Sequence, residues 1–169
     1  MALRRGDWIL VDTNVIIEAH RVGCWGAMAS EFALITVEKV IEETQTGHQN
    51  RSPEQNIHEG ELRSGFHQIS TVTRTQLATI DLDYADHGLD DGEHHLVALA
   101  SSRDDAAWLL NSPDRGTIRF CSRAGWLDRL ISLEAMTDTL GLPHGRRLRG
   151  NHTEGWLRRE INRFSFGLS

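Results

Sequence analysis

Acidic residues stand in several short stretches of this chain where carboxylates could do chemistry. Asp12 follows the apolar run Trp8-Ile9-Leu10-Val11 directly, and further acids stand at Glu42-Glu43, in Asp90-Asp91-Gly92-Glu93, and at Asp114. Carboxylates that are brought together repel one another unless cations neutralise them. Oxygen ligands of this kind favour Mg²⁺ or Mn²⁺, which can activate water for phosphodiester hydrolysis. If the acids converge, the sequence predicts a metal-dependent hydrolase.

The elements expected around these acids alternate between strands and helices. Apolar or β-branched runs predict strands at 8–11, 34–35, 66–72, 108–110 and 130–133. Helical patterns cover 15–20, 27–33, 74–80, 93–101, 116–124, 133–140 and 156–164, and Thr36 is the expected N-cap of another helix that ends near Thr46. The segment 47–65 is read as a long loop with one helical turn at 58–63. This order predicts an α/β fold, a three-layer α/β/α sandwich with a four- or five-stranded parallel sheet.

The acids also have simpler interpretations, taken one at a time. Asp12 is suited to cap a helix, and Asp90 with Glu93 has the spacing of a capping box. Asp114 fits a turn or a cap, and one of Glu42 and Glu43 must face solvent on an amphipathic helix. Parallel strands, however, bring their carboxyl ends to one edge of a sheet, where ligands bind. The joint arrangement therefore carries the functional prediction.

The chain resembles the PIN-domain nucleases over residues 8–140. The similarity lies in Leu10-Val11-Asp12-Thr13-Asn14-Val15, in Val40-Ile41-Glu42-Glu43, and in Asp91-Gly92-Glu93 followed by Leu96-Val97-Ala98-Leu99-Ala100. The resemblance implies a compact α/β/α fold with a clustered acidic pocket. It also implies Mg²⁺- or Mn²⁺-dependent cleavage of single-stranded or structured RNA.

The resemblance assigns roles to particular residues. Asp12, Glu93 and Asp114 would be the metal ligands, and Glu43, which fits the family pattern better than Glu42, would complete the catalytic set. A supporting shell would comprise Thr13, Asn14, Asp91, Asn111 and Ser112. The chain departs from the family at the fourth acidic position, because Asn111-Ser112-Pro113-Asp114 has no acid directly after the small hydroxyl residue. This departure puts a second metal ion in doubt.

The resemblance implies a single PIN-like nuclease domain at 1–140, and a helical, arginine-rich extension at 141–169 is expected to pack on it. The segment 144–169 holds six arginines against Glu154 and Glu160, a balance of +4, so the net charge of −6 leaves −10 for the rest. Arg146, Arg147 and Arg149 are the arginines expected to contact RNA phosphates. The apolar stripe Trp156, Leu157, Ile161 and Phe164 is expected to pack on the core, or else on a second subunit in a homodimer.

The expected location is the cytoplasm, with no membrane partner. The chain has no apolar run of membrane-spanning length and no signal-peptide pattern near Met1, and Cys24 and Cys121 are read as free thiols. Small single-domain members of the family are often toxins of toxin–antitoxin pairs, so RNA and an antitoxin protein are the implied partners. The alternative function is a catalytically degenerate domain that binds RNA or protein without cutting.

Other chemistries fit the sequence less well. His94-His95 lies beside Glu93, but no His-Glu-x-x-His or paired Cys/His spacing indicates zinc, and histidines on a helix surface are the simpler interpretation. A haloacid-dehalogenase-like phosphatase would need a second Asp where Asn14 stands. A dinucleotide-binding domain would need a Gly-x-Gly-x-x-Gly turn, which the chain lacks after its first apolar run.

Overall fold

A parallel sheet forms the centre of the molecule. The structure, a computed structural model, describes residues 2–46, 57–104, 107–142 and 147–167. Within these residues the sheet has four strands, all parallel, in the order β3-β2-β1-β4. They are β1 (Trp8–Val11), β2 (Ala33–Val37), β3 (Gln68–Ser70) and β4 (Trp108–Asn111). The predicted α/β class with a parallel sheet is confirmed.

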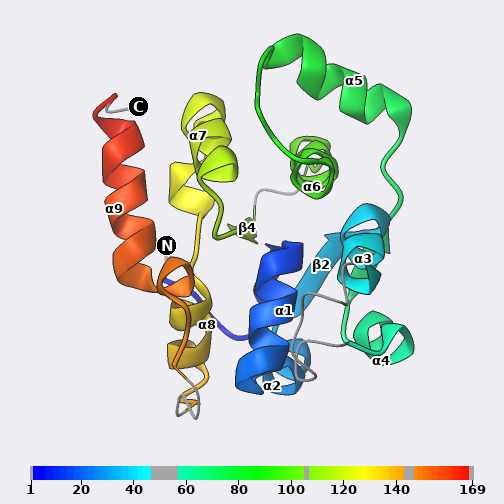
Figure 1. Ribbon diagram of the computed structural model, residues 1–169, viewed down its shortest axis with the longest axis vertical. Helices are drawn as coiled ribbons and strands as arrows, with labels where there is room; N and C mark the ends of the chain where they lie inside the picture. The colour runs from blue at the N-terminus through cyan, green and yellow to red at the C-terminus, as the bar shows by residue number, and fades with distance from the viewer. Residues whose placement is uncertain (1, 47–56, 105–106, 143–146, 168–169) are drawn as a thin grey trace.

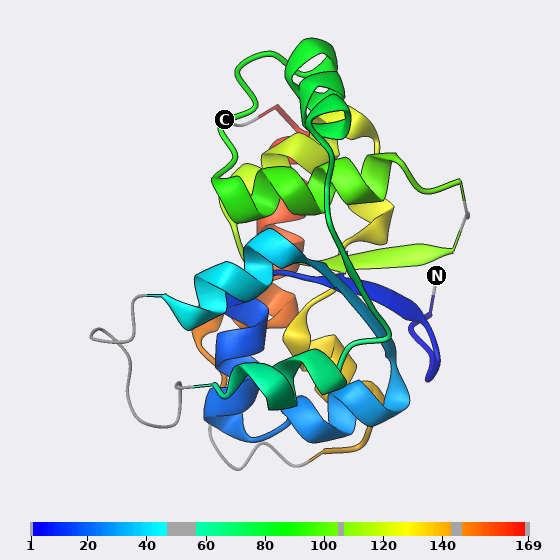
Figure 2. The ribbon, with the colours of Figure 1, turned by 90° about the vertical axis from the view of Figure 1, so that its right-hand side faces the viewer.

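Helices cover both faces of this sheet (Figure 2). The connections from β1 to β2 and on to β3 contain α1 (Thr13–Val22), α2 (Trp25–Glu31), α3 (Glu38–Gln45) and α4 (Glu59–Ser64). The return to β4 contains α5 (Arg74–Asp83) and α6 (Asp91–Ser101), and α7 (Arg115–Ala124), α8 (Leu133–Thr139) and α9 (Glu154–Ser165) follow. Among the described residues, no helix combines the length and the apolar composition that crossing a membrane requires.

The strand order explains why Asp12 stands at a position where open α/β sheets commonly bind ligands. β1 pairs with β2 on one side and with β4 on the other, so the direction of winding reverses between β1 and β4. Open α/β sheets bind ligands at such a reversal, outside the carboxyl ends of the strands. Asp12 directly follows β1 and Ser112 directly follows β4. Both residues therefore stand at the place where this architecture binds ligands.

The strand residues are apolar on both sides because helices cover both faces. Ile9, Leu10 and Val11 are fully buried, as are Leu34 and Ile35 of the neighbouring strand. A continuous apolar run, rather than an alternating one, is what a strand buried on both faces requires. This core fixes the ends of β1 and β4, which Asp12 and Asp114 follow.

The C-terminal segment lies against the same body. Helix α9 runs beside α7 and α8 (Figure 1), and Leu157 is buried in the core. The carboxylate of Glu18, itself buried on α1, accepts hydrogen bonds from the Arg21 side chain at 2.8 and 2.6 Å. It also accepts one from the backbone N–H of Arg149 at 2.8 Å. A buried, paired carboxylate thus fastens the start of the extension to α1.

Two local predictions are wrong. The strand expected at 130–133 is reduced to one bridge between Leu130 and Leu110, because Ser132 caps α8 through a 3.0 Å hydrogen bond from the backbone N–H of Ala135. Thr36 caps no helix and belongs to β2, where its hydroxyl donates to the carbonyl of Val11 at 2.9 Å. A partner distant in sequence therefore places Thr36 in a strand, and a helix cap at Ser132 ends the expected fifth strand.

Candidate active site

Helix N-termini bring the acids together at the reversal point of the sheet. Asp12 caps α1 and accepts the N–H of Thr13 at 2.7 Å, and Asp114 caps α7 and accepts the N–H of Gly116 at 2.6 Å. Asp90 caps α6 in a capping box with Glu93. The simpler interpretation of these acids as caps is therefore correct. It does not exclude a functional one, because N-terminal N–H groups and helix dipoles also stabilise negative charge at the site.

Asp12 is the most deeply buried acid of this cluster, at 3% exposure. The hydroxyl of Ser112 lies 3.4 Å from its second carboxylate oxygen. Burial raises the pKa of Asp12 to about 7, opposed by the N–H of Thr13 and reinforced by the charges of Asp90, Glu43 and Asp114. The protein's own groups therefore leave negative charge at this position poorly compensated.

Glu43, and not Glu42, belongs to the cluster. Its carboxylate accepts the hydroxyl proton of Thr13 at 2.7 Å and the backbone N–H of Gly92. Burial raises the pKa of Glu43, the Thr13 hydrogen bond opposes this shift, and the charge of Asp90 adds to it. Glu42 is exposed, with Lys39 Nζ at 3.4 Å from its carboxylate. The choice that the sequence left open is thus resolved in favour of Glu43.

Glu93 lies between the N-termini of α6 and α7. Its carboxylate is buried and accepts the backbone N–H of Asp90 at 3.2 Å. Burial raises the pKa of Glu93 to about 8, and the charges of Asp114, Asp90 and Asp12 add to this, together with a hydrogen bond to Asp114. Asp114 thus reaches the cluster through Glu93, although no acid follows the small hydroxyl residue directly.

The predicted supporting shell divides into two groups. Thr13 and Ser112 are buried and contact the carboxylates of Glu43 and Asp12, as described above. Asn14 is exposed on α1, and Asp91 is exposed with one carboxylate oxygen 3.7 Å from Lys39 Nζ. Asn14 and Asp91 are therefore surface residues, whereas Thr13 and Ser112 are enclosed with the carboxylates.

Asn111 lies at the end of β4 but turns its amide away from the acids. In the orientation that satisfies both amide atoms, it donates to the carbonyl of Ile131 at 3.2 Å and accepts the N–H of Leu133 at 3.3 Å. It is fully enclosed, at 2% exposure. Asn111 therefore holds the start of α8 against the sheet and offers no oxygen to an ion at Asp12.

Asp90 is the member of the cluster that the sequence did not assign to the site. Its charge raises the pKa of Asp12, Glu43 and Glu93, so its carboxylate acts on all three. Its capping-box spacing with Glu93 was visible and indicates a helix start. Only the fold shows that this helix starts beside Asp12.

The arginines predicted to bind RNA lie away from the acids where the structure describes them. Arg146 is outside the described residues. Arg147 accepts a hydrogen bond at its carbonyl from Arg21, and Arg149 donates its N–H to Glu18. Glu18 stands six positions after Asp12 on α1, about 9 Å along a helix axis. These arginines therefore flank the far part of α1.

The carboxylate oxygens of the cluster are the ligand type that a hard divalent cation prefers. To bind one ion together, the carboxylates would need to move closer to one another. All groups are oxygen donors, and the raised pKa values of Asp12 and Glu93 show a place where a cation would relieve repulsion. Among the described residues, no three of these acids bring ligand oxygens within 4.8 Å of one another. A hollow of about 640 Å³ between β4, α8 and α9 contains none of them.

Gly92 sets how closely α6 approaches Glu43, which leads to a prediction. A Cβ at position 92 would collide with the Glu43 carboxylate, which the Thr13 hydroxyl holds in place. We expect Gly92→Ala to displace Glu43 and to lower any hydrolytic activity of the acidic cluster roughly 10-fold to 100-fold, the size of effect seen when a supporting contact is lost. Alanine favours helices by about 1 kcal/mol over glycine, and this gain opposes the cost of displacing Glu43. The free energy of unfolding should therefore change little.

The matched control for this variant is Gly26→Ala on α2, where a Cβ meets nothing within 4 Å. Steady-state cleavage rates and thermal melts of both variants check the prediction. Equal activity of the two variants would show that the position of Glu43 does not matter.

Comparison with known proteins adds no assignment to this geometry. No family model, no curated protein and no solved structure matches the chain. The functional interpretation therefore depends on the residues described above.

Proposed function

We propose that this protein is a metal-dependent ribonuclease of the PIN-domain type. The observation that carries the proposal is the meeting of Asp12, Glu43, Glu93 and Asp114 where the winding of the sheet reverses, with the pKa of Asp12 and Glu93 raised to about 7 and 8. Structural ion-pair networks also shift pKa values, but there cations balance the acids. Here the carboxylates raise one another's pKa values, which is the arrangement that a divalent cation stabilises.

Each residue has a defined part in this proposal. Asp12, Glu93 and Asp114 would hold Mg²⁺ or Mn²⁺, which when bound activates water and stabilises charge on the phosphate. Glu43, whose pKa burial raises, would be a stronger base than an ordinary carboxylate and is suited to accept a proton from the attacking water. Thr13 fixes the orientation of Glu43, and Ser112 contacts Asp12.

Arginines on α7 supply a route for RNA phosphates toward the acids. Arg115 directly follows Asp114, and a hollow of about 180 Å³ is lined by Arg115, Arg119, Arg163 and Phe164. Guanidinium groups bind phosphates, and an aromatic ring can stack on a base. We therefore assign first contact with RNA to α7 and α9 instead of Arg147 and Arg149.

Cleavage of a structured RNA panel by the tag-free protein tests this function. We expect cleavage with Mg²⁺ or Mn²⁺, none with chelator, and recovery when the ion is restored. Cleavage that persists in chelator would exclude the mechanism. Metal binding without any turnover would instead favour the alternative, a degenerate domain that binds RNA or protein.

The biological setting is a further part of the proposal. A ribonuclease of this size is suited to be the toxin of a toxin–antitoxin pair in the cytoplasm, with an antitoxin protein as its partner. Leu157 of the apolar stripe on α9 is buried within the chain, which favours packing on the core. A homodimer through this stripe stays a prediction.

A further inference from the structure

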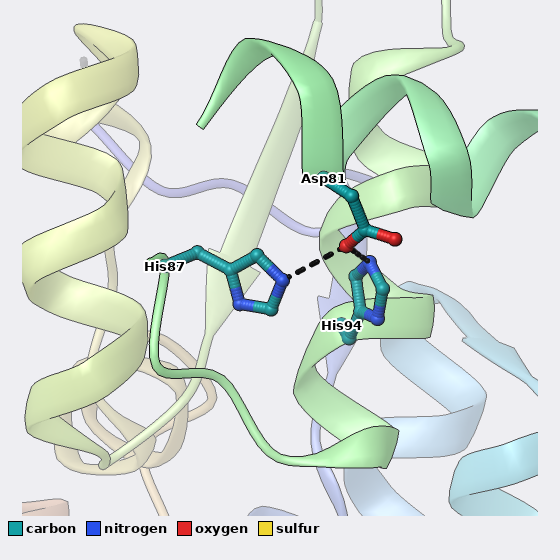
Figure 3. A group of neighbouring side chains, drawn as sticks. All are labelled: Asp81, His87 and His94. Carbon is teal, nitrogen blue, oxygen red and sulfur yellow. Dashed lines mark hydrogen bonds and ion pairs between the residues drawn. The ribbon is translucent and has the colours of Figure 1, made fainter. Parts of the chain in front are cut away.

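A second group of chemically active side chains lies on the outer layer formed by α5 and α6. Asp81 stands near the end of α5, His87 in the loop that follows, and His94 in the first turns of α6. Figure 3 shows both imidazole rings directed at the Asp81 carboxylate. The Nε2 atoms of His87 and His94 each lie 3.1 Å from Oδ1 of Asp81.

The three ligand atoms have the spacing of a metal site. All three atoms lie within 4.8 Å of one another. Among the described residues, no other group of three or more His, Cys, Asp or Glu side chains brings its ligand atoms this close together. Ligands about 2.0–2.2 Å from a tetrahedral Zn²⁺ are roughly 3.3–3.5 Å apart, close to the separations seen here. An ion could therefore enter with only small shifts of the side chains.

The environment of the trio also suits an ion with one open position. Both histidine side chains are 17% exposed, whereas the Asp81 side chain is 56% exposed and leaves one side of the group to solvent. Nε2 of His94 is buried and makes no hydrogen bond of acceptable geometry within the described part of the chain. A bound ion would satisfy this nitrogen, and water would complete the coordination.

We propose that Asp81, His87 and His94 form a binding site for Zn²⁺, separate from the acidic cluster. Two imidazole nitrogens select zinc over Mg²⁺, which prefers oxygen ligands and keeps its own waters. The carboxylate, two neutral imidazoles and a water are a ligand set of the kind found in zinc sites with an open position. Sequence spacing could not show this site, because the ligands are six and seven residues apart and meet through the turn between two helices.

Binding requires one rearrangement that can be observed. Nδ1 of His87 accepts the N–H of Leu89 at 3.1 Å, so in this state the ring carries its proton on Nε2 and donates it to Asp81. Zinc would bind at Nε2, and the single proton of the neutral ring would move from Nε2 to Nδ1. The Leu89 N–H must then turn away, which the left-handed backbone of Gly88, at φ +68°, makes feasible.

The site would link ion binding to the loop that carries Asp90. Zinc would join the end of α5 and residue 87 to α6, whose first turn holds Glu93 beside His94. The carbonyl of Gly88 also packs near Gly116, next to Asp114. We expect the ion to order the segment 84–90 and so to hold the α6 N-terminus in place.

Calorimetric titration of the metal-free, tag-free full chain with ZnCl₂ tests the proposal, with Mg²⁺ in excess to occupy oxygen sites. We expect one Zn²⁺ per chain. Asp81→Asn and His87→Ala should each weaken binding by at least the roughly 10-fold to 100-fold that loss of an outer-shell partner causes. In ¹⁵N–¹H NMR spectra, zinc should shift the Leu89 amide and move the His87 proton to Nδ1.

His95→Gln is the matched control, because His95 neighbours His94 on the same helix but is not a member of the trio. This variant should bind zinc as the unmodified chain does. Zinc affinity that is unchanged in Asp81→Asn and His87→Ala, with their folds intact by circular dichroism, would overturn the proposal. Absence of stoichiometric zinc binding would do the same, and would leave the trio as a polar contact between Asp81 and the two histidines.

Discussion

Asp12→Asn is expected to abolish RNA cleavage and, at the same time, to make the metal-free protein more stable. The carboxylate of Asp12 is the buried centre of the acidic cluster, and asparagine removes its charge while keeping its shape. A bound metal ion contributes several kcal/mol to transition-state stabilisation, so losing a central ligand should lower the cleavage rate roughly 10³-fold or more. Single-turnover cleavage with saturating Mn²⁺ measures this loss.

The gain in stability follows from the same burial. With its pKa raised from 3.8 to about 7, an ionised Asp12 at pH 8 costs up to about 4 kcal/mol relative to the unfolded chain. Asparagine can still accept the N–H of Thr13, and its amide can donate to Ser112. Allowing for relaxation, we expect a gain of about 2 kcal/mol, or roughly 4–8 °C in Tm for a domain of this size.

Asp91→Asn is the matched control for both effects. Asp91 undergoes the same chemical change in the same region, but its side chain is 79% exposed. We expect cleavage and Tm close to those of the unmodified chain. A lower Tm for Asp12→Asn in chelator would contradict the electrostatic description of the site, and full activity of that variant would exclude the proposed ribonuclease.

Most of the fold can be predicted from the sequence because burial on both faces of the sheet requires continuous apolar runs in its central strands. The strands at the centre of the sheet are enclosed on both faces, so β1 and β4 are visible as apolar runs. The failures lie where a distant partner competes. Thr36 found the Val11 carbonyl instead of a helix cap, and Ser132 started α8 before a fifth strand could form.

The sequence predicts those members of the candidate site that belong to a short local sequence pattern. Asp12, Glu43 and Glu93 each follow or lie within a recognisable local pattern. Asp90 stands among the acids of the sequence but receives no role of its own in the predicted site, because its effect on Asp12 depends on where α6 begins in space. Asn111 was expected near the ion because strand ends are shared, but the direction of its side chain depends on α8.

The stability of the metal-free protein should fall as pH rises from 6.5 to 8. Burial and neighbouring acids raise the pKa of Asp12 to about 7 and of Glu93 to about 8, above their values of 3.8 and 4.5 in the unfolded chain. The folded state therefore binds more protons than the unfolded state, and the stability that these groups give at low pH is lost as pH rises through their folded pKa values. We expect a loss of about 1–2 kcal/mol over this range.

Below pH 6.5 the histidines whose pKa burial lowers, His20, His95 and His152, offset part of this trend. Burial lowers the pKa of His152 from 6.5 to about 4, so its neutral form is favoured in the folded state, and stability is lost as pH falls through this window. The range above 6.5 therefore isolates the carboxylates. Urea denaturation in chelator at closely spaced pH values measures the slope, and Asp12→Asn should flatten it. Because Mg²⁺ would replace the missing protons, it should stabilise the protein more at pH 8 than at pH 6.5. A stability that is constant or increases from pH 6.5 to 8 would show that burial and the neighbouring acids do not raise the pKa values of Asp12 and Glu93.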